Sequence, residues 1–88
     1  MALYEFYGES CPHCLDMMPI IDKLISEGIK IEKLETWQNT ENANKQKDLD
    51  KDMCGGVPFF INTDSGQWIC GSTTEEKLRA WASGEKLS

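Results

Sequence analysis

The fold of this chain depends above all on residues 2–14, which read ALYEFYGESCPHC. Residues 2–7 form a short aromatic and apolar run, as expected for a buried strand. Two cysteines, Cys11 and Cys14, follow at the next turn with two residues between them. Helical spacing begins directly afterwards, so Cys11 is predicted at the N-terminus of a helix. The unpaired N–H groups and the dipole of such a helix end favour a thiolate over a thiol.

The segment after the cysteines, residues 15–25, has the apolar spacing of a helix. Its apolar face is expected to carry Met18, Ile21, Leu24 and Ile25. The helix is predicted to end near Glu27, with Gly28 as the residue after the C-cap. Pro12 fits the first helical turn, whereas Pro19 lies inside the helix and is expected to kink it.

Five further elements are predicted: a strand at 29–34, a polar helix at 40–51, strands at 59–62 and 67–70, and a last helix that buries Leu78, Trp81 and Ala82. The strand at 29–34 should run parallel to the first, because a helix connects the two. The polar helix has a thin apolar face, formed by Ala43, Leu49 and Met53. Its charged run, 45–52, alternates in sign and is expected to face solvent. Ser72 or Thr73 is expected to cap the last helix.

Length and charge limit the classes of protein that the chain can represent. Its 88 residues suffice for one small domain, residues 1–88. The net charge of −6 argues against nucleic acid or an anionic membrane as a partner, and it fits a monomer that resists self-association. No apolar run approaches the ~20 residues that span a bilayer. The start of the chain leads directly into the strand pattern without a signal-peptide pattern, so we expect a cytoplasmic protein.

Several coupled positions together resemble the thioredoxin superfamily over nearly the whole chain. They are the Cys11–Cys14 pair after a strand, Pro19 inside the helix, Val57-Pro58 at the start of the third strand, Gly66 in the hairpin, and Gly71 after the returning strand. The resemblance implies an α/β protein with the minimal thioredoxin fold, β-α-β-α-β-β-α, built as a four-stranded mixed sheet with three helices. In size the chain is similar to glutaredoxins and to glutaredoxin-like thioredoxins. Its Pro12-His13 dipeptide is like that of the periplasmic DsbA oxidases.

The two cysteines of the motif are assigned different roles. Cys11, the N-terminal one, is expected to be more exposed and to attack a substrate disulfide. Cys14, one turn deeper, is expected to resolve the mixed disulfide that results. His13, when protonated, would stabilise the Cys11 thiolate; alternatively it is an exposed histidine with little effect.

The resemblance also implies roles for residues outside the motif. Glu5 occupies the place where related proteins bury a carboxylate behind the second cysteine, and it would relay the proton of Cys14 through a water. Its alternative is a surface position on the strand. Pro58 is expected to be the family's cis-proline and to lie against the cysteine motif. Val57 would then pair its backbone with an extended substrate chain, and Pro12 and Gly71 would complete the substrate-binding surface.

Two additional cysteines, Cys54 and Cys70, distinguish the chain. The implied topology places both at the same end of the domain as Cys11 and Cys14. Three interpretations remain open. They are small buried hydrophobic residues, a second dithiol that exchanges with the first, or half of a four-thiolate site for zinc or an iron–sulfur centre.

These features predict a thiol–disulfide oxidoreductase that acts on disulfides of proteins or of small thiols through the Cys11–Cys14 disulfide. We expect it to need no metal and no organic cofactor, and to be regenerated by an upstream reductase or by glutathione. Glutathione would require a cationic rim, for which the candidates are Lys45, Lys47 and Lys51. The alternatives are a zinc or iron–sulfur module that uses all four cysteines and a redox-inert interaction module.

Overall fold

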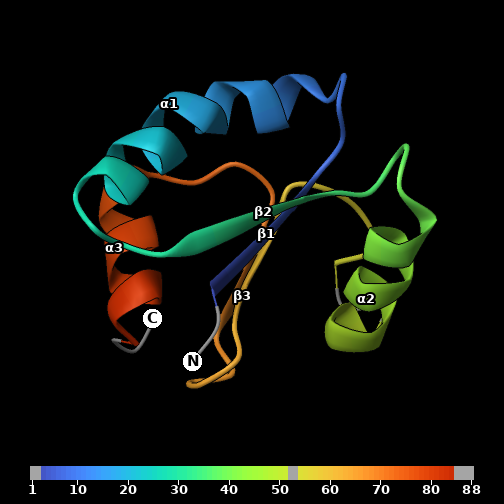
Figure 1. The fold of residues 1–88 in the computed structure, drawn as a ribbon. Helices are drawn as coiled ribbons and strands as arrows, with labels where there is room; N and C mark the ends of the chain where they lie inside the picture. The colour runs from blue at the N-terminus through green and yellow to red at the C-terminus, as the bar shows by residue number, and fades with distance from the viewer. Residues whose placement is uncertain (1–2, 52–53, 85–88) are drawn as a thin grey trace.

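The computed structural model describes residues 3–51 and 54–84, and it confirms the predicted order of elements, β-α-β-α-β-β-α (Figure 1). The elements are β1 (Leu3–Tyr7), α1 (Pro12–Ser26), β2 (Ile31–Glu35), α2 (Thr40–Asp50), β3 (Phe59–Asn62), β4 (Trp68–Cys70) and α3 (Glu75–Ser83). The predicted apolar position Met53 of the second helix lies outside the described residues.

The four strands form one mixed sheet in the order β2-β1-β3-β4. β1 pairs in parallel with β2 and antiparallel with β3, and β4 returns antiparallel to β3. Glu5 lies in the middle of the sheet, opposite Lys33 of β2 on one side and Phe60 of β3 on the other. The expected four-stranded mixed sheet with three helices is therefore confirmed.

The helices divide between the two faces of the sheet. α1 and α3 cover one face and α2 covers the other (Figure 1). Alternation along β1 turns Leu3 toward the larger core, which includes Ile21, Phe60 and Trp81. Phe6 belongs to a smaller core on the face of α2. Each face of β1 is therefore buried, which explains why its sequence is apolar without strict alternation.

The buried face of α1 lacks two of the four residues predicted for it. It consists of Cys14, Met17, Ile21 and Leu24. Met18 is only partly buried, and Ile25 is 36 % exposed. Cys14 begins this face, and successive steps of three, four and three residues lead from it through Met17 and Ile21 to Leu24. The buried stripe of α1 therefore connects the second cysteine directly to the core.

β2 begins at Ile31, two residues later than predicted, because residues 28 and 29 terminate α1. The Gly28 N–H donates to the Ile25 carbonyl at 3.0 Å, and the Ile29 N–H donates to the Leu24 carbonyl at 3.1 Å. This pattern is a Schellman motif, and the φ of +99° at Gly28 is one that glycine adopts readily. The predicted role of Gly28 is confirmed, while Ile29 belongs to the helix end and not to the strand.

Two expectations about the later helices are wrong. In the charged run expected to face solvent, Asp50 is instead buried, as is Gln46, whereas the other described charged residues of the run, Lys45, Lys47, Asp48 and Lys51, are exposed as expected. α3 is capped by Thr74, whose side chain accepts from the Lys77 N–H at 3.2 Å, and not by Ser72 or Thr73. The predicted burial of Leu78, Trp81 and Ala82 in α3 is confirmed.

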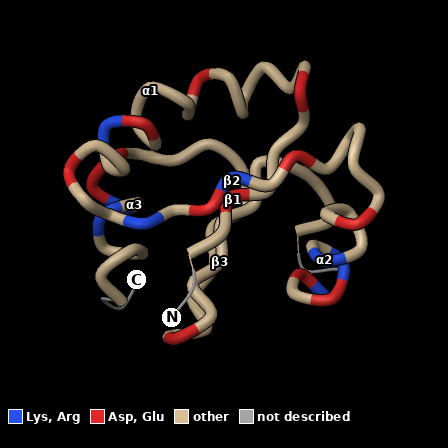
Figure 2. The backbone as a smooth tube through the Cα atoms, viewed as in Figure 1, with Lys and Arg blue, Asp and Glu red and all other residues tan. Residues whose placement is uncertain are grey.

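Charges of both signs are interspersed along α2 and are spread over the other helices and the connecting turns (Figure 2). Within residues 3–51 and 54–84, no helix is long and apolar enough to cross a membrane.

Candidate functional site

Cys11 occupies the N-cap position of α1, at the end of the turn that leaves β1. Its sulfur accepts from the backbone N–H of Cys14 at 3.3 Å. The turn is closed on the other side by the Cys11 N–H, which donates to the Gly8 carbonyl at 3.1 Å. A backbone N–H directed at the sulfur, at the positive end of a helix, favours negative charge on that sulfur. The predicted position of Cys11 at a helix N-terminus is confirmed.

The two cysteines of the motif are free thiols in this structure. Cys11 is 4 % exposed and Cys14 is fully buried, so the expected order of exposure is observed, with a small difference. Burial, and secondly its hydrogen bond with Cys11, raise the pKa of the Cys14 thiol to about 12. Cys14 is therefore a thiol at neutral pH and needs a proton acceptor before it can act as a nucleophile.

Glu5 is fully buried, which resolves the alternative of a surface position. Neither of its carboxylate oxygens has a hydrogen-bond partner among the described residues. Burial raises its pKa to about 7, opposed by the positive charge of Lys33 and assisted by the negative charge of Asp22. The charge of Glu5 also contributes to the raised pKa of Cys14, so the two groups are close enough to interact electrostatically.

The loop before β3 lies against Cys11. The Val57–Pro58 peptide bond is cis, as predicted. The carbonyl oxygen of Val57 is 3.9 Å from the Cys11 sulfur, although 46 positions separate them along the chain. The Pro58 carbonyl accepts from the Gly71 N–H at 2.8 Å, which places Gly71 beside this loop.

The other two predicted motif residues, Pro12 and His13, are exposed in the first turn of α1. Their exposure leaves them accessible to a molecule that approaches Cys11. His13 thus lies two positions after Cys11, on the solvent side of the helix.

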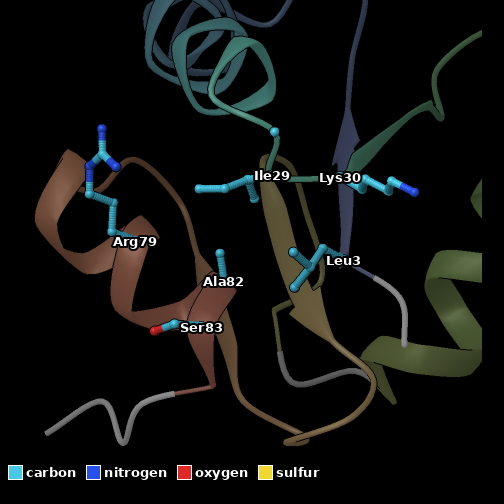
Figure 3. Close-up of a pocket in the computed structure, with 7 residues that line it drawn as sticks. Leu3, Ile29, Lys30, Arg79, Ala82 and Ser83 are labelled. Atoms are coloured by element: carbon cyan, nitrogen blue, oxygen red, sulfur yellow. The ribbon is translucent and has the colours of Figure 1, made fainter.

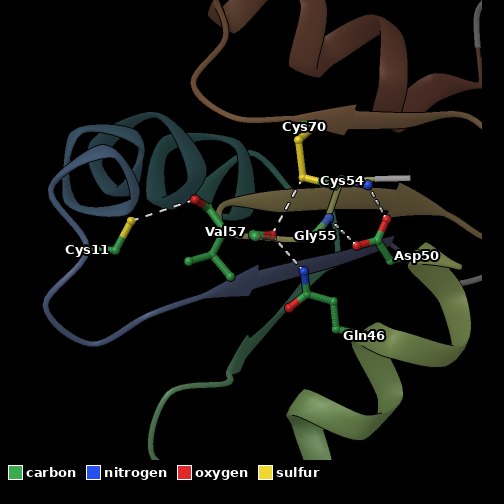
Figure 4. Close-up of a disulfide and its surroundings, with 8 residues drawn as sticks. Cys11, Gln46, Asp50, Cys54, Gly55, Val57 and Cys70 are labelled. Carbon is green, nitrogen blue, oxygen red and sulfur yellow. Dashed lines mark hydrogen bonds between the residues drawn. A yellow bond between two sulfur atoms is a disulfide. The ribbon is translucent and has the colours of Figure 1, made fainter. Parts of the chain in front are cut away.

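Cys54 and Cys70 form a disulfide with a Cα–Cα distance of 5.5 Å (Figure 4). Of the three interpretations, this structure agrees with the paired state. Cys54 is partly buried, and Cys70 is exposed. The described residues contain no group of three or more His, Cys, Asp or Glu side chains placed to hold a metal ion. A four-thiolate site would require both paired sulfurs to be free.

Two side chains of α2 hold the segment that follows Cys54, and sequence analysis missed both. The carboxylate of Asp50 accepts from two consecutive backbone N–H groups, those of Cys54 and Gly55, the second at 2.7 Å (Figure 4). Gln46, one turn earlier, donates from Nε2 to the Gly56 carbonyl at 2.7 Å. The position of Asp50 in the sequence was a usable signal. The C-terminal end of a helix carries partial negative charge, so a carboxylate in the last turn needs hydrogen-bond donors from outside the helix to stabilise it.

A second carboxylate organises the loop on the other side of the motif. Glu35, at the end of β2, accepts from the backbone N–H groups of Glu9 at 2.8 Å, Trp37 at 3.0 Å and Gln38 at 2.7 Å. Burial opposes its ionisation, but these backbone donors hold the pKa of Glu35 below its usual value. The Trp37 indole is thereby placed over Gly8, with 56 % of the residue exposed.

A shallow groove of about 330 Å³ runs between these two carboxylate-supported loops. Its lining includes Trp37, Gln46, Lys47 and residues 55–57. Of the three lysines expected to form a cationic rim, Lys47 lines the groove. Lys45 instead lies over the ring of Tyr4, 4.2 Å from its centroid.

Another cavity, of about 410 Å³, lies at the opposite end of the sheet (Figure 3). It is lined by Leu3, Gly28, Ile29, Lys30, Arg79, Ala82 and Ser83. Leu3 begins β1, whereas Cys11 follows the end of that strand, so the cavity is remote from the cysteines. Its lining has no thiol or carboxylate, and we therefore take as the candidate site the groove lined by Val57, whose carbonyl oxygen lies 3.9 Å from the Cys11 sulfur.

Comparison with known proteins adds no assignment: no model of a known protein family matches the chain, and no curated protein matches its sequence.

Proposed function

We propose that the protein is a thiol–disulfide oxidoreductase of the thioredoxin superfamily that acts through Cys11 and Cys14. One observation carries the proposal. The Cys11 sulfur lies between the N-terminus of α1, where it accepts the Cys14 N–H at 3.3 Å, and the Val57 carbonyl at 3.9 Å. A nucleophilic sulfur is thus placed beside a backbone carbonyl that can pair with an extended substrate.

In the first half of the reaction, the Cys11 thiolate attacks one sulfur of a substrate disulfide. The Cys11–substrate bond forms, the substrate disulfide breaks, and the second substrate sulfur leaves as a thiolate that takes a proton from solvent. The groove beside residues 55–57 supplies the surface on which the substrate backbone lies next to Cys11.

In the second half, Cys14 attacks the Cys11 sulfur and releases the substrate as a thiol, leaving a Cys11–Cys14 disulfide. Because the pKa of Cys14 is raised to about 12, its proton must pass to a base first. Glu5 is the buried carboxylate that acts on Cys14, and its pKa of about 7 suits a group that both accepts and returns a proton near neutral pH. The substrate gains two electrons and two protons in total.

The substrates in this proposal are disulfides of proteins or small thiols, and an upstream reductase or glutathione regenerates the dithiol. The exposed Trp37 and Lys47 at the groove give a partner one aromatic and one cationic contact. The reaction itself requires no organic cofactor, since the electrons are carried by the two sulfurs.

Equilibration of the protein in glutathione redox buffers, followed by acid quenching, alkylation and mass spectrometry, tests the proposal. We expect the Cys11–Cys14 pair to interconvert reversibly between dithiol and disulfide, and the reduced protein to reduce the interchain disulfides of insulin. Cys11→Ser should abolish the activity. Cys14→Ser should accumulate a mixed disulfide between Cys11 and the substrate or glutathione.

The metal content is measured on the same purified protein. Stoichiometric zinc, or visible absorbance of an iron–sulfur centre that disappears in the Cys54→Ser/Cys70→Ser variant, would contradict the proposal in favour of the four-cysteine module. Absence of exchange at Cys11 and Cys14 under all buffers would favour the redox-inert interaction module.

A further inference from the structure

The segment from Cys54 to Pro58 is held in place from two sides, by hydrogen bonds from α2 and by a disulfide to β4. On the side of α2, Asp50 accepts from the N–H groups of Cys54 and Gly55, and Gln46 donates to the Gly56 carbonyl. On the side of β4, the Cys54–Cys70 disulfide is a covalent link. Figure 4 shows the two sets of contacts converging on this one segment, with the Val57 carbonyl directed at Cys11 beyond it.

The buried side chains of α2 bind this same segment. Gln46 and Asp50 are the buried residues of α2, and both are used on residues 54–56. Two buried polar side chains, one turn apart, thus form hydrogen bonds with the backbone just before Val57. This arrangement sets the place of the Val57 carbonyl relative to the Cys11 sulfur, and with it the geometry of substrate pairing.

The two sides differ in their response to redox conditions. The hydrogen bonds from α2 do not depend on thiol chemistry, whereas the disulfide can be opened. Cys70 is exposed and Cys54 is partly buried, so Cys70 is the more accessible end of the disulfide for an attacking thiolate. Once reduced, the segment keeps its α2 contacts and loses its link to β4.

We propose that Cys54–Cys70 is a second redox-active site, whose closed state holds the Val57 segment in the arrangement that binds substrate at Cys11. The inference rests on the proposed oxidoreductase function. Opening the disulfide frees residues 54–57 to move, and binding must then restore their order, which weakens substrate binding without altering Cys11 or Cys14.

The opening step is an exchange with a dithiol reductant. A reductant thiolate attacks the Cys70 sulfur, the Cys54–Cys70 bond breaks, and Cys54 leaves as a thiolate that takes up a proton. The second reductant thiol then attacks the mixed disulfide and releases Cys70 as a thiol. Two electrons and two protons pass to the pair, and the reductant becomes a disulfide.

The kinetic test starts from proteins whose Cys11–Cys14 pair is oxidised, so that the substrate peptide is the only reductant present. Reduction of that pair by a two-cysteine peptide is followed by tryptophan fluorescence and mass spectrometry in single-turnover mode. Wild type, with Cys54–Cys70 closed, is compared with Cys54→Ser/Cys70→Ser and Cys54→Ala/Cys70→Ala. We expect the half-saturating peptide concentration to rise about fivefold in both variants, with the limiting rate within about twofold of wild type.

Equal half-saturating concentrations in all three proteins would overturn the inference and leave the proposed function intact. If none of the three reacts with the peptide, the proposed function itself fails. The two outcomes are therefore distinguishable.

A second measurement needs no substitution at the disulfide. In Cys11→Ser/Cys14→Ser, Cys54–Cys70 is titrated with dithiothreitol, and amide hydrogen exchange is recorded in the closed and open states. We expect residues 54–57 to exchange faster when the disulfide is open, with residues 17–24 of α1 unchanged as the internal control. A disulfide that stays closed throughout the titration, or unchanged exchange in residues 54–57, would overturn the inference.

Discussion

The indole ring of Trp37 packs directly on the α-carbon of Gly8, leaving no room for a β-carbon at that position. Gly8 is buried and is the last residue before the turn that leads to Cys11. Its carbonyl accepts from the Cys11 N–H at 3.1 Å. The contact therefore joins the loop after β2 to the turn that leads to Cys11.

Gly8→Ala is expected to destabilise the protein and displace Trp37. The added methyl group would meet the indole ring, and overpacking of this kind costs roughly 1–3 kcal/mol of unfolding free energy. Denaturant unfolding measures the loss, and Trp37 fluorescence reports the displacement. Gly56→Ala is the matched control: a β-carbon there meets no atom within 4 Å, so its stability should stay within about 0.5 kcal/mol of wild type. Equal stability of Gly8→Ala and Gly56→Ala would contradict the close packing of Trp37 on Gly8.

Glu5 should make the stability of the protein depend on pH. Its pKa is raised from 4.5 to about 7 in the folded protein, because burial disfavours the charged form. Between these values the folded state binds more protons than the unfolded state, so the free energy of unfolding should fall as pH rises from about 4.5 to 7 and level off above. The expected fall is roughly 1–3 kcal/mol.

Glu5→Gln should remove this dependence, so the difference in unfolding free energy between wild type and variant should change across the same pH window. Urea unfolding at a series of pH values measures it. Glu32→Gln, at an exposed position of β2, is the control and should follow the wild-type profile. A wild-type profile retained in Glu5→Gln would show that another group titrates. Slower resolution of the mixed disulfide in Glu5→Gln would further support its role as proton acceptor for Cys14.

Cys14 should resist alkylation at pH values where an ordinary cysteine reacts. With its pKa raised to about 12, the thiolate fraction at pH 8 is on the order of 10⁻⁴, compared with about one tenth for a thiol of pKa 9. Treatment of the reduced protein with iodoacetamide at pH 8 should therefore label Cys11 well before Cys14. Peptide mapping after timed quenching gives the order. Faster labelling of Cys14 would reverse the roles proposed for the two cysteines.

Asp50→Asn should destabilise the protein although the change is nearly isosteric. The carboxylate accepts from two N–H groups, and an asparagine can accept one while directing its own NH₂ at the other donor. The cost is expected to be about 1–3 kcal/mol, measured by thermal or denaturant unfolding. Asp48→Asn removes an exposed acid from the same helix and should leave stability within about 0.5 kcal/mol of wild type. Similar losses in both variants would mean that net charge, and not the bonds of Asp50, is responsible.

Much of the fold follows from local signals in the chain. The apolar run before the cysteines, the helical spacing after them and the glycines at turns predict every element, because each depends on periodicity and turn chemistry within a few residues. The errors lie at helix ends and faces. Ile29 alternates like a strand residue, but its N–H closes α1. Thr74 caps α3 although two other residues fit a capping box equally well.

Some features of the candidate site likewise follow from local sequence, whereas others depend on tertiary contacts. The position of Cys11 at a helix N-terminus, with Cys14 one turn deeper, follows from the local sequence, because strand, turn and helix there are contiguous. The burial of Glu5, by contrast, depends on tertiary packing, since both faces of a central strand are covered when helices pack on each side of the sheet. The pairing of Cys54 with Cys70 and the burial of Asp50 likewise depend on where β4 and α2 meet the loop before β3. Such contacts join residues distant in sequence, and no local pattern encodes the distance between them.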